Sequence, residues 1–330
     1  MREVAALAGV SRQTVSRVVN GHPSIRESTR QRVLTAMDEL QFRPNRAARM
    51  LSTARSNTIG ILASSSSSLF GPASSIDAVE SAAREAGSFV AIAHLASVET
   101  DEIEAALDHL MAQAVEGIVV VAPQRRVLDA MHSVSIAVPS VTMHSAEAAG
   151  DEAFADQIEG ARMAARHLAE LGHTTVAHLA GPSDWAEANA RRDGFLAEAR
   201  TLGMRVTVTA PGDWTSASGA RIGADLLRDR TVTAVFSSND QMALGVLHAL
   251  RRDGRSAPQD VSVIGFDDIP EAAYFAPPLT TIRPDFTGLG RTCVARLLAA
   301  IDRLPTPGAG SAVVTPRLIV RESTGPAPTR

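Results

Sequence analysis

The sequence predicts a small helical unit at the N-terminus, followed by a larger α/β body made of two parallel-sheet subdomains around a cleft. Three short helical patterns fill residues 1–43, and strand-like apolar runs alternate with amphipathic stretches from residue 58 onward. Such alternation, with continuous apolar strands, is typical of parallel sheets covered by helices. The body holds too many of these segments for one comfortable sheet, and 330 residues suffice for about two domains.

Three helices are expected in residues 1–43. Residues 3–8 are good helix formers that end at Gly9, and Ser11 is a suitable N-cap for a second helix. A third helix is expected from about Glu27 to Leu40. The side chains expected to be buried are Val4, Ala5, Leu7 or Ala8, Val15, Val18, Val19, Val33, Leu34, Met37 and Leu40. Two helices joined by a tight glycine turn form a helix-turn-helix unit, whose second helix is able to enter the major groove of DNA.

The outward side of the second helix carries side chains that are able to read DNA bases. Arg12, Gln13 and Arg17 lie on this side, and arginine and glutamine hydrogen-bond to guanine and adenine respectively. Residues 1–56 contain ten arginines and four acidic residues, whereas the remainder of the chain is acidic. This asymmetry indicates contact with a polyanion at the basic end. The alternative is a solvated helix face without a binding role.

Residues 44–57 are predicted to form a hinge helix and a polar linker. The short helical stretch has a narrow face of small residues, Ala47 and Ala48, from which Leu51 protrudes. Because the stretch has too few apolar residues to fold by itself, we expect it to be disordered when free and helical when bound.

The body is expected to occupy residues 58–330. Its strands are predicted at Thr58–Ala63, Phe89–His94, Gly117–Val121, Ser140–Met143, Thr175–Leu179, Val206–Thr209, Ala234–Ser237 and Val261–Phe266. Its helices are predicted at Ile76–Ala86, Thr100–Gln113, Gly160–Leu171, Arg191–Leu202, Ser216–Arg228 and Asp240–Asp253.

The composition argues against several classes of protein. No apolar run reaches the roughly 20 residues that cross a bilayer, and no signal-peptide pattern is visible, so we expect a cytoplasmic protein without a membrane partner. Cys293 is the single cysteine, which excludes an internal disulfide and a multi-cysteine metal site. We expect neither a metal nor a cofactor.

Polar side chains follow several predicted strands of the body. Since the carboxyl ends of strands line the ligand crevice of open α/β sheets, Arg191, Asn239 and Asp267 are expected to converge there. Charged and amide groups in one cleft suit a ligand rich in hydroxyls. The aromatic candidates for the same pocket, with core packing as the alternative role, are Trp214, Phe70, Trp185 and Phe286.

The N-terminal sequence has a specific pattern. Val4-Ala5-Ala6-Leu7-Ala8-Gly9-Val10-Ser11, followed by Thr14-Val15-Ser16-Arg17-Val18-Val19-Asn20, resembles the headpiece of the lactose-repressor/galactose-repressor (LacI/GalR) family. The resemblance implies base reading by Arg12, Gln13 and Arg17. It implies phosphate contacts by Ser11, Thr14, Ser16 and Asn20. It also implies that the hinge helices of a dimer, with Ala47, Ala48 and Leu51, pack in the minor groove and kink the duplex.

The body repeats the family pattern, for example in Ser238-Asn239-Asp240-Gln241-Met242-Ala243-Leu244-Gly245 and Ile264-Gly265-Phe266-Asp267-Asp268. The resemblance implies a periplasmic-binding-protein-like body, with an N-subdomain of about 58–155 and 284–312 and a C-subdomain of about 156–283 and 313–330. It is similar to the lactose-repressor branch, in which the residue matching Trp214 stacks on a sugar ring. His144, a further pocket candidate, stands where close relatives often carry aspartate, so the identity of the sugar stays open.

The resemblance implies a DNA-binding transcription regulator, a repressor of carbohydrate-use genes whose operator affinity is controlled by a small sugar. A homodimer is expected, because two headpieces match a near-palindromic operator. The tail after Val320 has no leucine heptads, so we expect no helical tetramerisation tail. Family members usually have a few residues before the first helix, so with Met1 at the start this helix is expected to lack its cap, and the true start stays open.

Two other classes of function compete with this reading. A periplasmic-type sugar-binding protein would share the cleft but should carry a signal peptide and no basic head. A sugar-processing enzyme has candidate carboxylates in Asp267 and Asp268, yet adjacent residues after a strand point in different directions. No nucleophile elbow, phosphate loop or paired-histidine metal motif accompanies them. Neither class explains residues 1–56, so we expect a protein that is not an enzyme.

Overall fold

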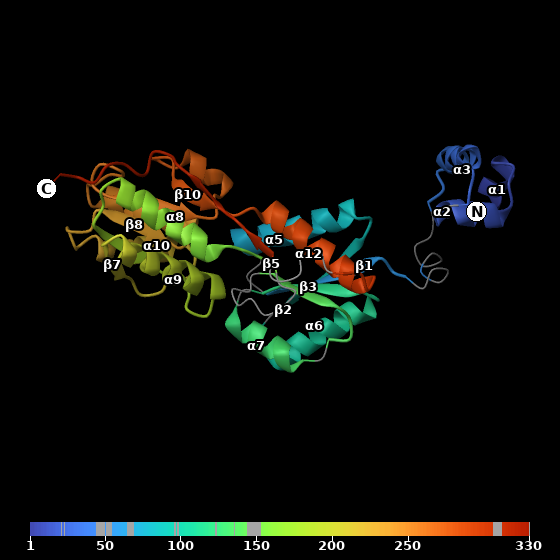
Figure 1. The fold of residues 1–330 in the computed structure, drawn as a ribbon, viewed down its shortest axis with the longest axis horizontal. Helices are drawn as coiled ribbons and strands as arrows, with labels where there is room; N and C mark the ends of the chain where they lie inside the picture. The colour runs from blue at the N-terminus through green and yellow to red at the C-terminus, as the bar shows by residue number, and fades with distance from the viewer. Residues whose placement is uncertain are drawn as a thin grey trace. The chain divides into compact units, whose positions relative to one another are not determined.

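The structure, a computed structural model, divides into two compact units, Met1–Asn57 and Thr58–Arg330 (Figure 1). It describes residues 1–20, 22, 24–43, 50, 55–64, 69–95, 97, 99–122, 124–134, 136–143, 153–305 and 312–329. The hinge residues Ala47, Ala48 and Leu51 and the pocket candidate His144 lie outside the described residues. None of the helices in the described ranges is long and apolar enough to span a bilayer.

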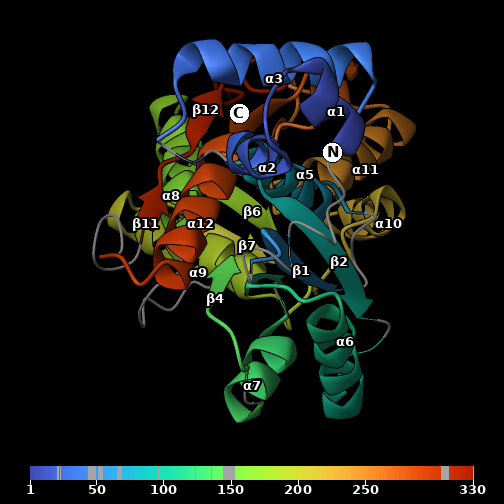
Figure 2. The same ribbon diagram turned by 90° about the vertical axis from the view of Figure 1, so that its right-hand side faces the viewer.

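The first unit holds the three predicted helices, α1 (Arg2–Leu7), α2 (Arg12–Val19) and α3 (Glu27–Glu39), each in contact with the other two (Figure 2). Gly9 closes the turn before α2 with a φ of +62°, a conformation that glycine adopts without steric cost. Met1 provides no side-chain cap for α1. The buried core of this headpiece consists of Val4, Ala5, Ala8, Val15, Val18, Val33 and Ala36.

Leu34 and Leu40, both expected in this core, are instead exposed, and of the alternatives Leu7 and Ala8 it is Ala8 that is buried. Leu7, Leu34 and Leu40 keep 51%, 42% and 40% of their surface accessible. The reason is geometric: Ala8 points inward from the end of the first helix, and Val33 and Ala36 form the inner stripe of α3, so Leu34 and Leu40 lie beside that stripe. Met37 is partly buried against the core.

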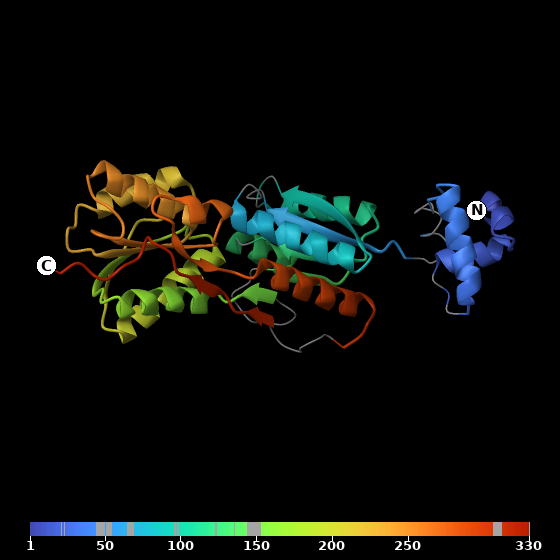
Figure 3. The ribbon, with the colours of Figure 1, turned by 90° about the horizontal axis from the view of Figure 1, so that it is seen from above.

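The N-lobe of the second unit is a six-stranded parallel sheet in the order β11-β5-β4-β3-β1-β2. Helices α5 and α12 cover one face of it, and α6 and α7 cover the other (Figure 3). The strands are β1 (Thr58–Ser64), β2 (Phe89–Leu95), β3 (Gly117–Val121), β4 (Ser140–Met143), β5 (Ala153–Ala155) and β11 (Ala312–Val314). The helices are α5 (Phe70–Glu85), α6 (Thr100–Ala112), α7 (Arg125–Ser133) and α12 (Phe286–Ile301).

The C-lobe repeats this design with the strand order β12-β10-β9-β8-β6-β7, in which only β12 is antiparallel. Helices α10 and α11 pack on one face, and α8 and α9 on the other. The strands are β6 (Thr175–Leu179), β7 (Arg205–Val208), β8 (Ala234–Ser237), β9 (Ser262–Phe266), β10 (Thr280–Arg283) and β12 (Arg317–Ile319). The helices are α8 (Gln157–Glu170), α9 (Ala186–Thr201), α10 (Ser216–Leu226), α11 (Asp240–Arg252) and the 3-10 helix η1 (Pro270–Tyr274).

The predicted α/β class and all eight predicted strands are confirmed, with ends that differ by one residue at most. The prediction missed the strands β5, β10, β11 and β12 and the helices α7 and α12. Three of these strands have only three residues, and α12 contains two glycines, so their local patterns are weak. Because β11 pairs with β5, the N-lobe extends to Val314, two residues beyond the expected boundary.

Each sheet reverses its direction of growth beside its first strand, since β1 lies between β2 and β3 and β6 lies between β7 and β8. In doubly wound sheets, the loops at the carboxyl ends of the strands on either side of such a reversal line the ligand crevice. The loops that follow β1, β3, β6 and β8 are therefore the segments expected to line a ligand crevice.

His178, on β6, is fully buried between Phe195 and Phe236, whose rings stack on it at 5.8 and 5.0 Å. Its Nδ1 donates to the carbonyl oxygen of Phe236 at 3.2 Å, which fixes the neutral tautomer. Burial, opposed by this hydrogen bond and assisted by the nearby arginines, lowers the pKa of His178 to about 4.

We predict that acid destabilises the body through His178. Between its ordinary pKa of 6.5 and about 4, the unfolded chain binds a proton at this histidine that the folded chain does not bind, so the free energy of unfolding falls as the pH falls. The contribution present at pH 7 and lost by pH 4 is about 3 kcal/mol. Urea unfolding of wild type and His178→Gln at pH 7 and pH 5 measures it. His94→Gln, on the exposed edge of β2, is the control, and an equal pH dependence in all three proteins would contradict the assignment.

Candidate functional site

Helix α2 of the headpiece begins with a complete N-cap. The Ser11 Oγ accepts a hydrogen bond from the Thr14 main-chain nitrogen at 3.1 Å and lies 3.0 Å from the Thr14 hydroxyl. Cap and first turn therefore hold each other in position, and Asn20 is the C-cap residue at the other end.

The exposed side of α2 carries the three predicted base readers. Arg12, Gln13 and Arg17 are exposed, whereas Val15 and Val18, on the opposite side, are buried. Thr14 and Ser16 are half-buried at the edge, and Ser11 and Asn20 are exposed at the two ends. No acidic residue lies in the first turn of α2, so the positive end of the helix dipole and the arginines act with the same sign. This surface is suited to a polyanion that also presents hydrogen-bonding edges.

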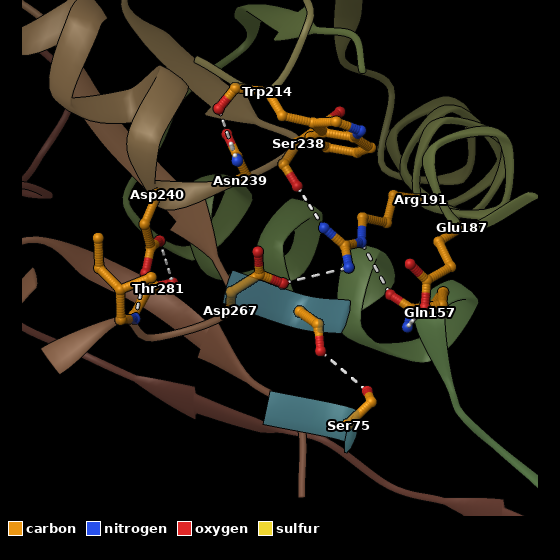
Figure 4. A network of polar contacts seen from close by, with 12 residues as sticks. Ser75, Gln157, Glu187, Arg191, Trp214, Ser238, Asn239, Asp240, Asp267 and Thr281 are labelled. Atoms are coloured by element: carbon orange, nitrogen blue, oxygen red, sulfur yellow. Dashed lines mark hydrogen bonds and ion pairs between the residues drawn. The ribbon is translucent and has the colours of Figure 1, made fainter. Parts of the chain in front are cut away.

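In the body, the guanidinium of Arg191 on α9 is the centre of a buried polar network, the Arg191 cluster, shown in Figure 4. Its three nitrogens donate to the Gln157 Oε1 at 2.8 Å, the Ser238 carbonyl oxygen at 2.5 Å and the Asp267 Oδ1 at 3.2 Å. The members of the cluster, all less than a tenth exposed, are Gln157, Glu187, Arg191, Ser238 and Asp267.

Aromatic rings cover the same guanidinium. The Cζ of Arg191 lies 3.8 Å from the centroid of the Phe266 ring and 5.8 Å from that of Trp214. Cation–π contact and three hydrogen bonds together offset the cost of burying this charge. The arrangement is a rigid donor group surrounded by acceptors and ring faces.

The loop after β9 turns its two acidic side chains in different directions. Asp267 and Asp268 both have positive φ values, 102° and 51°, which are uncommon for residues other than glycine. Asp267 faces Arg191, while the Asp268 carboxylate is held by Arg283 and by Arg321, the latter at 2.7 Å. Ion pairs on both sides keep the strained loop in place.

Asp240, on the first turn of α11, stabilises the loop after β9 through hydrogen bonds. Its carboxylate accepts hydrogen bonds from the Ile269 main-chain nitrogen at 2.9 Å and from the Thr281 hydroxyl at 2.6 Å (Figure 4). Burial and the neighbouring charge of Asp267 raise the pKa of Asp240, and the two hydrogen bonds oppose that rise.

Asn239 joins the cluster to the tryptophans. Its Oδ1 caps α11 through the Met242 nitrogen at 2.9 Å, and its Nδ2 donates to the Trp214 carbonyl oxygen at 3.0 Å. Trp214 has a φ of 72°, in a turn that Asp213 fixes by accepting from Thr215. The indole of Trp214 is 5% exposed, and within the described structure its Nε1 is buried without a hydrogen-bond partner.

The remaining aromatic candidates fall into two pairs. Trp185 lies edge-on to Trp214, with ring centroids 5.1 Å apart. Phe70 and Phe286, both from the N-lobe, also meet edge-on at 6.0 Å. Phe70 packs against the C-lobe core that contains both tryptophans, so the two lobes meet here. Phe286 also lines a cavity of about 370 Å³ between α5 and α12.

Several residues of this region were not among the predicted site residues. Gln157, Glu187 and Ser238 complete the Arg191 cluster, and Ser64, the last residue of β1, has a buried hydroxyl without a partner in the described part of the chain. Ser64 ends the buried strand β1 and Ser238 directly follows the buried strand β8, and this position at the carboxyl end of a strand was a usable signal. Gln157 and Glu187 lie in first turns of helices, where polar residues are ordinary.

The cluster offers charged donors, acceptors and aromatic surface together, a combination of groups that suits a neutral polar molecule. Four carboxylates in and near it are all engaged: Asp267 by Arg191, Asp268 by two arginines, Asp240 by Thr281 and Glu187 by Gln157. Among the described residues no group of histidine, cysteine and carboxylate side chains is placed to hold a metal ion.

Comparison with known protein families gives two matches. The family described as bacterial regulatory proteins, lacI family, matches residues 1–45. The periplasmic binding protein-like domain matches residues 165–324. The first range contains the capped helix α2, and the second contains most of the Arg191 cluster.

Individual relatives extend over nearly the whole chain. The lactose operon repressor of Escherichia coli K12 is 35% identical over 303 residues, which are 90% of this chain and 83% of the relative. CelR of Thermobifida fusca, an HTH-type transcriptional regulator, is 35% identical over 339 residues, 97% of this chain and 96% of the relative. A structure of the lac repressor dimer bound to operator and the anti-inducer ONPF superposes with a TM-score of 0.82 at 32% identity, covering 98% of both chains. With these similarities, the chain belongs to the LacI family of bacterial regulatory proteins.

Proposed function

We propose that this protein is a sequence-specific repressor of carbohydrate-use genes, whose affinity for its operator is set by a sugar or related metabolite bound beside Arg191. The observation that carries the proposal is the exposed side of α2, where Arg12, Gln13 and Arg17 lie opposite a buried valine face. Base edges in the major groove are read by such side chains, while Ser11, Thr14, Ser16 and Asn20 hold phosphates. The hinge residues Ala47, Ala48 and Leu51 enter the minor groove next to this contact.

A homodimer presents two such helices to a near-palindromic operator. Exposed apolar side chains on the body support this assembly. Phe89 and Ile92, on the edge strand β2, are 49% and 39% exposed, and Tyr274 and Leu244, on the C-lobe, are 87% and 38% exposed. Edge strands with apolar side chains are usually covered in a native protein.

The Arg191 cluster supports a hydroxyl-rich ligand. Hydroxyls both donate and accept, so they are able to replace the bonds among Arg191, Asp267 and Gln157 one for one. CelR, a relative, has been solved as a cellobiose complex, and its structure superposes with a TM-score of 0.71. The ligand controls DNA binding only if it binds one arrangement of the two lobes more tightly than the other. The other pocket candidates, Asn239, Trp214, Trp185, Phe70, Phe286 and His144, surround this ligand.

A regulatory role is favoured over a catalytic one. Hydrolysis of a glycosidic bond normally needs a pair of carboxyl groups across the scissile bond, and Asp267 and Asp268 are each engaged by arginine. Incubation of the purified protein with each sugar that it binds, followed by chromatography of the sugar, tests this point. Loss of the sugar over time would contradict the non-enzymatic role.

For DNA reading, we predict that Arg17→Ala lowers the preference for the operator over unrelated DNA by about 1–3 kcal/mol, because one direct base contact is lost. Fluorescence anisotropy with both duplexes at one salt concentration measures this preference. Arg32→Ala, an exposed arginine on α3, is the matched control and should leave the preference unchanged. If Arg17→Ala weakened binding to both duplexes equally, Arg17 would be a phosphate contact.

For ligand control, we predict that Asp267→Asn weakens sugar binding about tenfold or more while DNA binding in the absence of sugar persists. The reason is that hydrogen bonds to a charged group contribute about 1.5–3 kcal/mol. Isothermal titration and operator binding measure the two properties.

Asp268→Asn is the control, since its carboxylate faces Arg283 and Arg321 and not Arg191. Thermal melting of both variants reports the stability lost with each ion pair. An unchanged sugar titration in Asp267→Asn would exclude the Arg191 cluster as the binding site.

A further inference from the structure

A short segment of the C-lobe is bonded to the N-lobe beside the Arg191 cluster. This segment, Pro182–Trp185, here called the strap, lies between β6 and α9. The Arg125 main-chain nitrogen donates to the Asp184 carbonyl oxygen at 2.9 Å, and Gln124 and Trp185 form an antiparallel backbone bridge. The Nε of Arg126 pairs with the Asp184 Oδ2 at 3.1 Å. Main-chain and charge contacts therefore join the strap to the beginning of α7.

The strap also places Trp185 over the site. Trp185 is the N-cap residue of α9, the helix that carries Arg191, and it is only 8% exposed. Its ring meets that of Trp214 at 5.1 Å and 65°. Gly181, just before the strap, also lies against the Trp214 ring, because a Cβ at this position would come within 2.5 Å of it.

This packing leaves Trp214 only 5% exposed. A sugar that stacks on an indole covers one face of the ring. Gly181 and Trp185 both lie against Trp214, and the guanidinium of Arg191, which three hydrogen bonds hold in place, lies 5.8 Å from its ring centroid, so little of the ring is accessible to a ligand from solvent. Gly181 belongs to the main chain at the end of β6 and its nitrogen is bonded to Ser238, whereas Trp185 is held by the strap. Trp185 is therefore the group that has to move.

We propose that the strap is a gate and that Trp185 competes with the saccharide for Trp214. The proposal rests on the proposed function, in which a saccharide binds beside Arg191 and Trp214. Binding displaces Trp185, and the displaced segment pulls Asp184 away from Arg125 and Arg126. Occupancy of the site thereby removes contacts that hold the two lobes together.

The contacts between the strap and the N-lobe are weak enough for a bound ligand to break them. Arg126 and Asp184 are 68% and 32% exposed, so their ion pair is weak. The main chain contributes the hydrogen bond at Arg125 and the short bridge between Gln124 and Trp185. On its own lobe the strap is braced by the Asn189 Nδ2, which donates to the Ser183 carbonyl oxygen at 2.8 Å.

The first test measures the gate in the absence of any ligand. Trp185 and Trp214 are the only tryptophans in the chain, so the tryptophan fluorescence of the full-length protein, excited selectively over the single tyrosine, comes from this site alone. We expect Arg126→Gln to increase the acrylamide quenching constant about twofold, because the strap opens more often. Arg84→Gln removes a similar ion pair on α5, with an arginine that is also 68% exposed, and should leave quenching unchanged. Identical quenching in wild type and Arg126→Gln would show that the ion pair between Arg126 and Asp184 does not hold the strap closed, and would overturn the gate.

The second test measures competition, by isothermal titration of full-length variants with cellobiose, lactose and ribose. Trp185→Ala should bind the saccharide that wild type binds about three- to tenfold more tightly, because the aromatic contact to be broken is gone. Trp185→Phe keeps an aromatic ring and replaces the alanine variant in this test if that variant fails to fold. Its affinity for the saccharide should lie between those of wild type and Trp185→Ala.

The outcomes separate the two proposals. Weaker binding in Trp185→Ala or Trp185→Phe would make Trp185 a platform for the sugar, which overturns the gate and leaves the proposed function intact. Wild type and variants could bind none of the three saccharides while Arg126→Gln still increases quenching. The proposed ligand class would then fail, and so would the competition between Trp185 and a saccharide for Trp214.

Discussion

The buried ion pair between Arg191 and Asp267 is the constraint on which the rest of the C-lobe site depends. Its side chains are 5% and 8% exposed, so nearly all of the hydration of both charges is lost on folding. Such a pair is tolerable only when the remaining hydrogen bonds are satisfied. Gln157, the Ser238 carbonyl and the Phe266 ring meet that requirement, and they come from three separate elements. The pair thus fixes the mutual placement of α8, α9 and the loops after β8 and β9.

If a ligand binds beside Arg191 as proposed, the same constraint makes the site select it by hydrogen-bond pattern. A molecule that enters has to replace the bonds it breaks, because an uncompensated buried charge costs several kcal/mol. Hydroxyl groups on a rigid ring meet this demand, and a purely apolar molecule does not. The strained φ values of Asp267 and Asp268 persist because Arg191 holds one carboxylate and Arg283 and Arg321 hold the other. Selectivity and backbone strain therefore have one physical origin.

Strong and weak contacts are distributed unequally over the body. Within each lobe, helices on both faces of a parallel sheet form continuous apolar cores. Between the lobes, near the site, the contacts include an exposed ion pair and a short stretch of main-chain pairing at Asp184 and Trp185. Small binding energies can alter such contacts without disturbing either core. A family member that couples a ligand to DNA needs this division, because coupling requires two arrangements of similar free energy.

The sequence by itself determined the two-unit organisation, eight strands of the body and the three helices of the headpiece, because these depend on local periodicity, caps and glycine turns. It also placed Asn239 and Asp267 just after buried strands and Arg191 in the helical segment that follows another, which was enough to expect that they meet. Only the tertiary structure decided which partners they have: Gln157 and Glu187 come from helices whose first turns look ordinary, and Leu34 and Leu40 turned out to lie beside the core stripe. The three-residue strands and the strap were also beyond sequence patterns, since their pairing partners lie far along the chain. Local order follows from neighbours in sequence, whereas burial and partner choice follow from segments that meet only after the chain has folded.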